Sequence, residues 1–212
     1  MKKLVFLISV FCLAVQSINA QIIVSDDTTK CGNYTDVLEA VGADQDSIYA
    51  DDSYSSIIQI GFPFTFYGIT YTSLIVCDNG YITFNTILAN LPSGYQITTP
   101  LPGGGLLNEP VNAIMAPWHD ILLADPAGFG SGNGSVFIAK TGITPNRKFI
   151  ATWCSAAMFS CTDSLETFQI VLHETSNKIE TFIESKRSCA WNNGAAIHGL
   201  VDATSTNFDI VF

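Results

Sequence analysis

The residues that could carry chemistry are scattered along the chain and form no catalytic motif. The three histidines, His119, His173 and His198, stand far apart, and none lies in the H-x-H or H-E-x-x-H spacing of a metal site. There is no G-x-S-x-G segment, so a hydrolase with a serine nucleophile has no local support. These patterns give no indication of an enzyme.

Glutamates are the remaining candidates for catalysis, because a glycosidase needs two carboxyl groups on either side of a cleft. The chain offers four of them in its second half: Glu166, Glu174, Glu180 and Glu184. Charged residues on the solvent faces of strands explain these glutamates without further assumption. We therefore expect no catalytic residue among them.

Asp120 and Asp125 are the strongest candidates for a cation site, because they stand beside a loop rich in glycine and asparagine. Oxygen-rich loops bind Ca²⁺ through carboxylate and carbonyl oxygens. An aspartate that caps a turn next to Pro126 and Gly128 is ordinary turn chemistry, and this is the favoured interpretation. Ca²⁺ is thus the one cofactor that these residues suggest.

Aromatic residues in loops could stack on sugars, and three stand in segments that predict loops: Tyr95, Phe129 and Trp191. Residues 85–108 contain several prolines and three consecutive glycines, which predict a long irregular loop. A long loop in a compact domain often carries function. We expect this loop to provide the main contact surface for a ligand.

The elements that must position these side chains are strands. Runs rich in Val, Ile, Thr, Tyr and Phe recur at short intervals, and no window sustains the period of a helix. The strongest signal is the Asn79-Gly80 pair between the runs 71–77 and 81–84, since Asn-Gly favours a type I′ hairpin turn. The sequence predicts an all-β fold, an antiparallel β-sandwich of jelly-roll-like type with long loops.

The N-terminus predicts export. Lys2 and Lys3 precede an apolar run at residues 4–15, and Ala20 offers a small residue for cleavage, so residues 1–20 read as a signal peptide. The apolar run is too short to span a membrane. We expect a protein that is secreted, extracellular or held at the cell surface. Residues 21–53 are a polar leader, and residues 54–212 form the domain.

The net charge and the last residues of the chain indicate which partners to expect. The formal net charge is -10 and becomes -12 once cleavage removes two lysines, which disfavours nucleic acid as a partner. We expect no segment that spans a membrane. The chain stops on Ile210-Val211-Phe212, as if within a strand, so further domains of a longer chain are expected.

Five cysteines remain after cleavage: Cys31, Cys77, Cys154, Cys161 and Cys189. In an exported protein disulfides are the default state, and an odd count leaves at least one thiol unpaired. No two of them have the C-x-x-C spacing of a zinc or redox site. Structural disulfides together with a buried thiol are therefore expected.

Several short segments together resemble the nidogen-like (NIDO-type) extracellular domains. They are IGFPFTFYG at residues 60–68, VCDNGYITF at 76–84, AIMAPW at 113–118 and TFQIVL at 167–172. The segments PNR at 145–147, NKIE at 177–180 and CAWN at 189–192 are similar to the N-terminal regions of large secreted surface proteins of Bacteroidetes, including gliding-motility-associated adhesin-like proteins. The similarity spans roughly residues 55–201.

This resemblance implies a disulfide between Cys161 and Cys189. Cys77 and Cys154 depart from the family pattern, and they could pair with each other or with Cys31. The resemblance also implies a non-enzymatic module of a secreted or cell-surface protein, which acts in adhesion or in recognition of a matrix or partner. The ligand would be an extracellular protein or glycan. The alternative is a carbohydrate-binding or carbohydrate-active jelly roll that uses Ca²⁺ or a pair of carboxylates.

Overall fold

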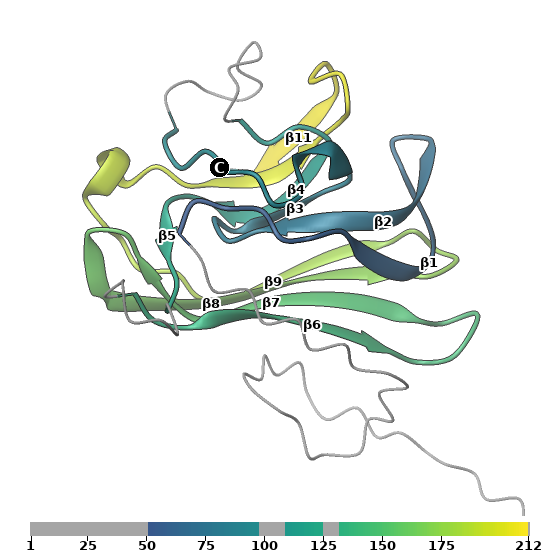
Figure 1. Ribbon diagram of the computed structural model, residues 1–212, viewed down its shortest axis with the longest axis horizontal. Helices are drawn as coiled ribbons and strands as arrows, with labels where there is room; N and C mark the ends of the chain where they lie inside the picture. The colour runs from purple at the N-terminus through teal and green to yellow at the C-terminus, as the bar shows by residue number, and fades with distance from the viewer. Residues whose placement is uncertain (1–50, 98–108, 125–131, 212) are drawn as a thin grey trace, which may run out of the picture.

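The computed structural model describes residues 51–97, 109–124 and 132–211, and these residues form two stacked antiparallel sheets (Figure 1). The first sheet runs in the order β1 (Ile58–Phe66), β2 (Ile69–Cys77), β3 (Tyr81–Thr83), β4 (Ala113–Trp118), β10 (Ile197–Val201) and β11 (Phe208–Val211). In the second sheet, β5 (Ile121–Leu122) and β6 (Ser135–Thr141) both pair with β7 (Lys148–Met158), which is followed by β8 (Cys161–His173) and β9 (Ile179–Ser185). The predicted all-β antiparallel sandwich is confirmed.

Helical structure in this part of the chain is limited to two short 3-10 turns, η1 (Thr86–Leu88) and η2 (Trp191–Gly194). Most neighbouring strands are consecutive in the chain. The chain crosses from the first sheet to the second after β4 and returns to it at β10, which pairs with β4. The segments before β5 and before β10 therefore meet at one end of the sandwich.

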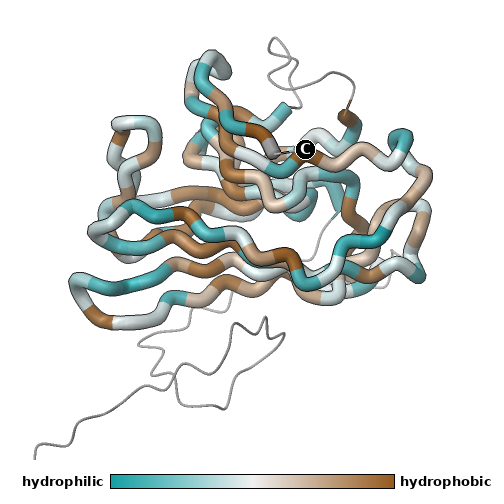
Figure 2. Tube along the Cα trace, turned by 180° about the vertical axis from the view of Figure 1, so that it is seen from behind, coloured by the Kyte–Doolittle hydropathy of each residue, from teal (hydrophilic) through white to brown (hydrophobic). Residues whose placement is uncertain are grey.

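Alternation of apolar and polar residues builds the core between the sheets. Along β1 the buried residues are every second one, from Ile58 to Phe66, as a strand with one face on a core requires. Phe149, Ala151 and Trp153 of β7 are fully buried opposite them, on the face that their alternation predicts. Apolar stretches follow the strands, while several of the connecting turns are hydrophilic (Figure 2).

A second apolar cluster covers the outer face of the first sheet. Its buried members include Ile75, Tyr81 and Met115, and they are joined by Leu88, Ala89 and Ile97 from the segment after β3. This sheet is thus buried on both faces, which explains the uninterrupted burial of β3 and β4. Residues 85–97 are the described part of the 85–108 loop that is expected to bind a ligand, and Leu88, Ala89 and Ile97 among them cover the sheet.

The turn between β2 and β3 differs from the expected type I′ turn. Cys77 pairs with Tyr81, so the turn has three residues, and of Asn79 and Gly80 only Gly80 has a positive φ (+90°). A Cβ atom on Gly80 would lie 2.0 Å from the carbonyl oxygen of Pro117. The hairpin is confirmed, but its glycine is needed for close contact with β4, and the Asn79 side chain is turned inward.

Candidate functional site

Loops that are distant in sequence meet at the end of the sandwich where the chain crosses between the sheets. The segment after β4, the β7–β8 turn and η2 lie together there, beside residues 51–52 and 93–95. We call this site the Trp191 corner. Its members are Asp51, Asp52, Tyr95, Asp120, Phe159, Trp191 and Asn192.

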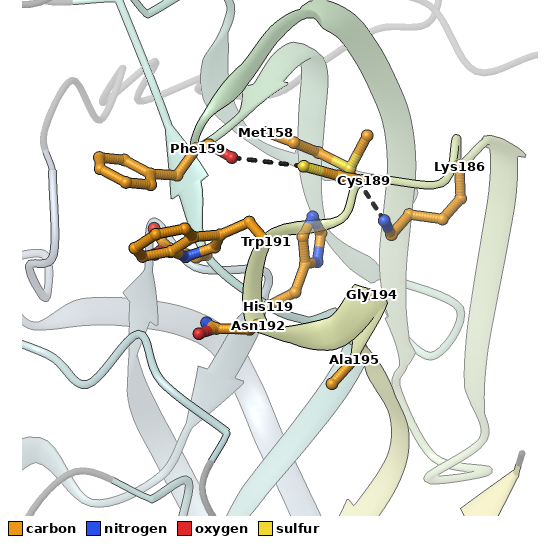
Figure 3. A pocket seen from close by; sticks show the side chains of 10 residues that line it. His119, Met158, Phe159, Lys186, Cys189, Trp191, Asn192, Gly194 and Ala195 are labelled. Atoms are coloured by element: carbon orange, nitrogen blue, oxygen red, sulfur yellow. Dashed lines mark hydrogen bonds between the residues drawn. The ribbon is translucent and has the colours of Figure 1, made fainter.

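Trp191 is the centre of this corner. Its indole Nε1 donates a 2.6 Å hydrogen bond to Asp120 Oδ2, and its ring lies 4.9 Å from the ring of Phe159. The two aromatic side chains project from neighbouring loops in the same direction (Figure 3). Trp191 nevertheless keeps 40% of its surface exposed. The indole is therefore held in one orientation while part of it faces solvent.

Tyr95 belongs to the same corner. Its carbonyl oxygen accepts a 3.4 Å hydrogen bond from Asn192 Nδ2, and its side chain is 40% exposed. Two of the three aromatic residues predicted to contact a ligand, Tyr95 and Trp191, are thus joined through adjacent loops. The third, Phe129, lies outside the described residues.

Three carboxylates line the edge of the corner. One oxygen each of Asp51, Asp52 and Asp120 lies within 4.8 Å of the other two. The pKa of Asp120 is raised to about 7, chiefly by burial and to a smaller extent by the charges of Asp52 and Asp51, against the lowering effect of the hydrogen bond from Trp191. Burial also raises the pKa values of Asp51 and Asp52.

Such a set of oxygens can accept hydrogen bonds from hydroxyl or ammonium groups, and hard cations such as Ca²⁺ prefer the same ligands. The sequence pairs Asp120 with Asp125, which lies outside the described residues. Cation binding by Asp120 and Asp125 therefore stays a prediction. Asp51 and Asp52, which the sequence places in a polar leader, are the neighbours that the fold brings to Asp120.

Asn79 holds these segments together. Its Nδ2 donates to Asp52 Oδ1 at 2.9 Å and to the carbonyl oxygen of Gly94 at 3.3 Å, while its Oδ1 accepts from the Ile121 amide at 2.8 Å. Asn79 is fully buried. The Asn-Gly pair predicts only a turn at this residue, because it carries no signal for contacts with distant loops.

Asp78 anchors the same turn from the other side. Its Oδ2 accepts a 2.9 Å bond from the Ser53 amide, and its Oδ1 accepts a longer bond of 3.4 Å from the Ser93 hydroxyl. Burial raises the pKa of Asp78 to about 7, although the Ser53 bond opposes this effect. Asp78 and Asn79 thus connect residues 52–53 and 93–94 to the sheet.

A buried charged cluster lies behind the corner. Glu166 is fully buried, its Oε1 contacts Nε2 of His119, and its Oε2 lies 3.5 Å from Nζ of Lys186. His119 and Lys186 line a shallow, half-open pocket together with Trp191 and Asn192 (Figure 3). The expectation that Glu166 lies on a solvent face is wrong, because its carboxylate is fully buried against His119 and Lys186.

The other candidate catalytic residues do not gather at this site. Glu174 binds Arg147, and Glu180 binds His173, at the opposite end of β8 from the corner. Glu184 is exposed on β9. His198 forms a 2.9 Å hydrogen bond with Thr181 Oγ1. Within the described ranges the histidines are thus held by separate partners, as the absence of a histidine motif suggests.

Cys161 and Cys189 form a disulfide with a Cα–Cα distance of 6.0 Å, which confirms the pairing implied by the family resemblance. The bond ties the segment that carries Trp191 to the start of β8. Cys154 is also disulfide-bonded, whereas Cys77 is a buried free thiol, so the two do not pair with each other. Cys31, the alternative partner, lies outside the described residues.

Comparison with known proteins places this fold in a family. A family model described as NIDO related matches residues 27–211, which is most of the chain. The chain belongs to the NIDO-related family. The match begins within residues 21–53, and the last residues of that range pair with the domain: Ser53 with Pro92, and Asp51 with Leu122. No curated protein and no solved structure matches this chain.

Membership of the NIDO-related family bears on function in a general way. Nidogen-like domains are in general extracellular, non-catalytic modules, and this agrees with the disulfide found here. Across the residues that the structure describes, no helix is both long and apolar enough to cross a membrane. The family match carries no information about a particular ligand.

Proposed function

We propose that this NIDO-related chain is an exported, non-enzymatic recognition module that binds an extracellular partner through the Trp191 corner, in adhesion to cells or matrix. The observation that carries this proposal is the hydrogen bond between Trp191 and Asp120. It fixes a partly exposed indole next to Asn192, whose side chain bonds to the backbone of a second exposed aromatic residue, Tyr95. An aromatic residue held in place before binding loses little conformational entropy when a ligand arrives.

The corner is a better candidate for this contact than the segment 85–97 as a whole. Ser93 and Gly94 are buried, and Leu88, Ala89 and Ile97 pack on the outer face of the first sheet. Removing this segment to test its role in binding would therefore also disturb the fold. Such a deletion could not separate a loss of binding from a loss of structure. Among the described residues of this segment, Tyr95 is an exposed aromatic residue that is linked to Asn192, the neighbour of Trp191.

Other exposed apolar residues support a surface site less well. Ile143, in the β6–β7 turn, is 75% exposed, and Ile87 is more exposed still. Single exposed apolar side chains are common on soluble proteins and need no functional explanation. An isoleucine side chain has no group that can form a hydrogen bond, so neither of these two side chains is fixed as the Trp191 indole is fixed by Asp120 and Phe159.

The experiment is an adhesion assay of the purified chain on cells and on matrix-coated surfaces. We expect Trp191→Ala and Tyr95→Ala each to weaken adhesion at least tenfold. Ile143→Ala is the control, since it removes an apolar side chain that is even more exposed and lies in the β6–β7 turn, outside the corner. Adhesion that is the same for Trp191→Ala and the unaltered chain, with both folded by circular dichroism, would refute the proposal.

A further inference from the structure

The second sheet has one face that is turned away from the first sheet (Figure 1). The alternate residues of β7 from Phe149 to Trp153 belong to the core between the sheets. Because side chains alternate along a strand, Ile150, Thr152 and Cys154 lie on the opposite, outer face. Cys154 is thus a disulfide-bonded residue on the outside of the sandwich.

The strand register arranges this outer face in rows. Two neighbouring rows cross four strands, and their members are Phe137, Thr152, Gln169 and Phe182 in one and Ala139, Ile150, Val171 and Glu180 in the other. The aliphatic and aromatic members make the middle of the face apolar. Gln169 Nε2 donates a 2.7 Å hydrogen bond to Thr152 Oγ1, so the polar pair between the two phenylalanines is satisfied within the face. Cys154 stands beside the first row, opposite Ser135.

The outer face is less exposed than its position predicts. Val171 and Thr152 each keep 4% of their surface exposed, and Phe137, Ile150 and Phe182 are half-buried. Among the described helices and strands, those with substantial contacts to β7 and β8 are their neighbours in the sheet and β4, which lies across the core. Soluble proteins rarely leave a large apolar face bare. A further segment is therefore expected to cover this side of the sheet.

The disulfide of Cys154 indicates which segment this is. Cys77 is a free thiol, and the Cys161–Cys189 disulfide uses two further cysteines. Of the six cysteines in the sequence, Cys12 and Cys31 then remain as partners for Cys154. Cleavage of the predicted signal peptide removes Cys12. Cys31 is therefore the partner that the mature chain retains.

The other end of the same segment is fixed to the same sheet. Asp51 pairs with Leu122, which pairs in turn with Ala157 of β7. Residues 32–50 can span about 60 Å when extended, at about 3.3 Å per residue, whereas four adjacent strands are only about 15 Å across. The NIDO-related family model begins at residue 27, so it includes this segment in the domain. The segment is thus long enough to cross the outer face between its two attachment points.

We propose that residues 21–50 cover the outer face of the second sheet and are fastened to it by a disulfide between Cys31, which lies outside the described residues, and Cys154. The segment contains apolar residues for such a contact, among them Ile22, Ile23 and Leu38. A second copy of the chain is a poorer occupant, because each copy carries a formal net charge of -10 and the two repel each other. The polar leader is then a part of the domain.

The bond between Cys31 and Cys154 requires an oxidant, because two thiols lose two protons and two electrons when they join. The oxidant is a thiol oxidase of the exporting compartment, whose own disulfide takes up these protons and electrons and becomes a dithiol. The Cys161–Cys189 disulfide needs the same chemistry. The proposed bond therefore adds no new requirement.

The first test is a disulfide map of the unaltered chain, exported into an oxidising compartment, alkylated without reduction and digested with chymotrypsin. This protease cuts after aromatic residues, so cleavage at Phe159 separates Cys154 from Cys161. We expect mass spectrometry to find the Cys31 peptide joined to the Cys154 peptide, in a chain that runs as a monomer without reductant, and to find Cys77 alkylated. A Cys154 peptide that is alkylated, or that is joined to any other cysteine, would overturn the proposal.

The second test examines the cover directly, by photochemical cross-linking of the full chain. The photoreactive residue p-benzoylphenylalanine in place of Phe182 should cross-link, within one chain, to a peptide from residues 21–50. The same residue in place of Ile143, which is exposed in the β6–β7 turn, is the control and should give at least tenfold less of this product. Cys31→Ser should lower the yield from position 182 at least threefold, since non-covalent contacts alone then hold the segment.

The other outcomes of cross-linking would each overturn the cover, even where the Cys31–Cys154 bond is found. Cross-links from position 182 to a second chain, together with a dimer in size-exclusion chromatography, would show that a second copy occupies the face. The absence of cross-links to residues 21–50 would show that this segment lies elsewhere. Melting curves establish that each variant is folded, and the disulfide map tests the proposal without any variant.

Discussion

Trp191 Nε1 and Asp120 Oδ2 are joined by a 2.6 Å hydrogen bond across 71 positions of the chain. The bond connects η2, before β10, with the segment that follows β4. Because the Phe159 amide donates in turn to the Asp120 carbonyl oxygen at 3.1 Å, the β7–β8 turn is fixed to the same aspartate. The aromatic surface and its polar rim therefore form one unit that depends on three loops.

The Cys161–Cys189 disulfide should be required to hold this unit in place. It closes a loop of 28 residues and fixes the segment just before Trp191. Replacing both cysteines with serine should lower the free energy of unfolding by about 2–4 kcal/mol, because the unfolded chain gains entropy. It should also make Trp191 more accessible to acrylamide. Urea unfolding and fluorescence quenching measure the two effects.

The control for this prediction is Cys77→Ala, which alters a free thiol outside the disulfide. That variant should leave the quenching of Trp191 unchanged, even where it lowers stability. Equal quenching in the double serine variant and in the unaltered chain would show that the disulfide does not position Trp191.

The stability of the fold should depend on the buried carboxylate of Glu166. Glu166→Ala leaves Lys186 without its counter-charge and His119 without its carboxylate partner, and such changes lower stability by about 3–5 kcal/mol. Glu184→Ala, on the exposed side of β9, should change stability by less than about 0.5 kcal/mol. Chemical unfolding of both variants tests this; a loss below about 1 kcal/mol for Glu166→Ala would contradict it.

Stability should fall as the pH rises from about 4 to about 7, because burial raises the pKa of Asp78 from 3.8 to about 7. The folded state then holds a proton that the unfolded state has lost, so increasing pH favours unfolding. Asp120 acts in the same direction. Asp202 acts oppositely: hydrogen bonds, chiefly from Asn207, lower its pKa to about 2, and its contribution is lost below about pH 4.

The measurement is urea unfolding across this range, with Asp78→Asn as the comparison. Asparagine can still accept from the Ser53 amide and donate to the Ser93 hydroxyl, but it does not titrate. We expect a shallower decline between about pH 4 and pH 7 in this variant. An identical fall in stability in both proteins would show that groups other than Asp78 cause the pH dependence.

The sequence predicts the sheets well because their signal is local. The alternation of Phe149, Ala151 and Trp153 places them on the core face without knowledge of their partners. The roles of Glu166 and Asn79 could not be found in this way. Each depends on groups far away in the chain, His119 and Lys186 in one case and Asp52 and Ile121 in the other. Neither a charged residue in a strand nor an Asn-Gly pair identifies such partners.

Gly80 provides the sharpest test of the link between the sheet and the Trp191 corner. A Cβ at this position would lie 2.0 Å from the Pro117 carbonyl oxygen, and its φ of +90° is strained for other residues. Gly68 has a similar φ of +80° but no atom within 4 Å of its Cβ position, so it isolates the backbone strain. We expect Gly80→Ala to destabilise the fold by about 3–5 kcal/mol and Gly68→Ala by about 1–2 kcal/mol.

Gly80→Ala and Gly68→Ala should also differ in their effect on adhesion. Displacing Gly80 moves Asn79, whose side chain holds Asp52 and Ile121, so the corner should be disturbed along with the fold. Gly68 lies in the turn between β1 and β2 and touches none of these residues. Gly80→Ala should therefore weaken adhesion under conditions where it is still folded, whereas Gly68→Ala should not. Equal adhesion by the two folded variants would show that the β2–β3 turn does not support the Trp191 corner.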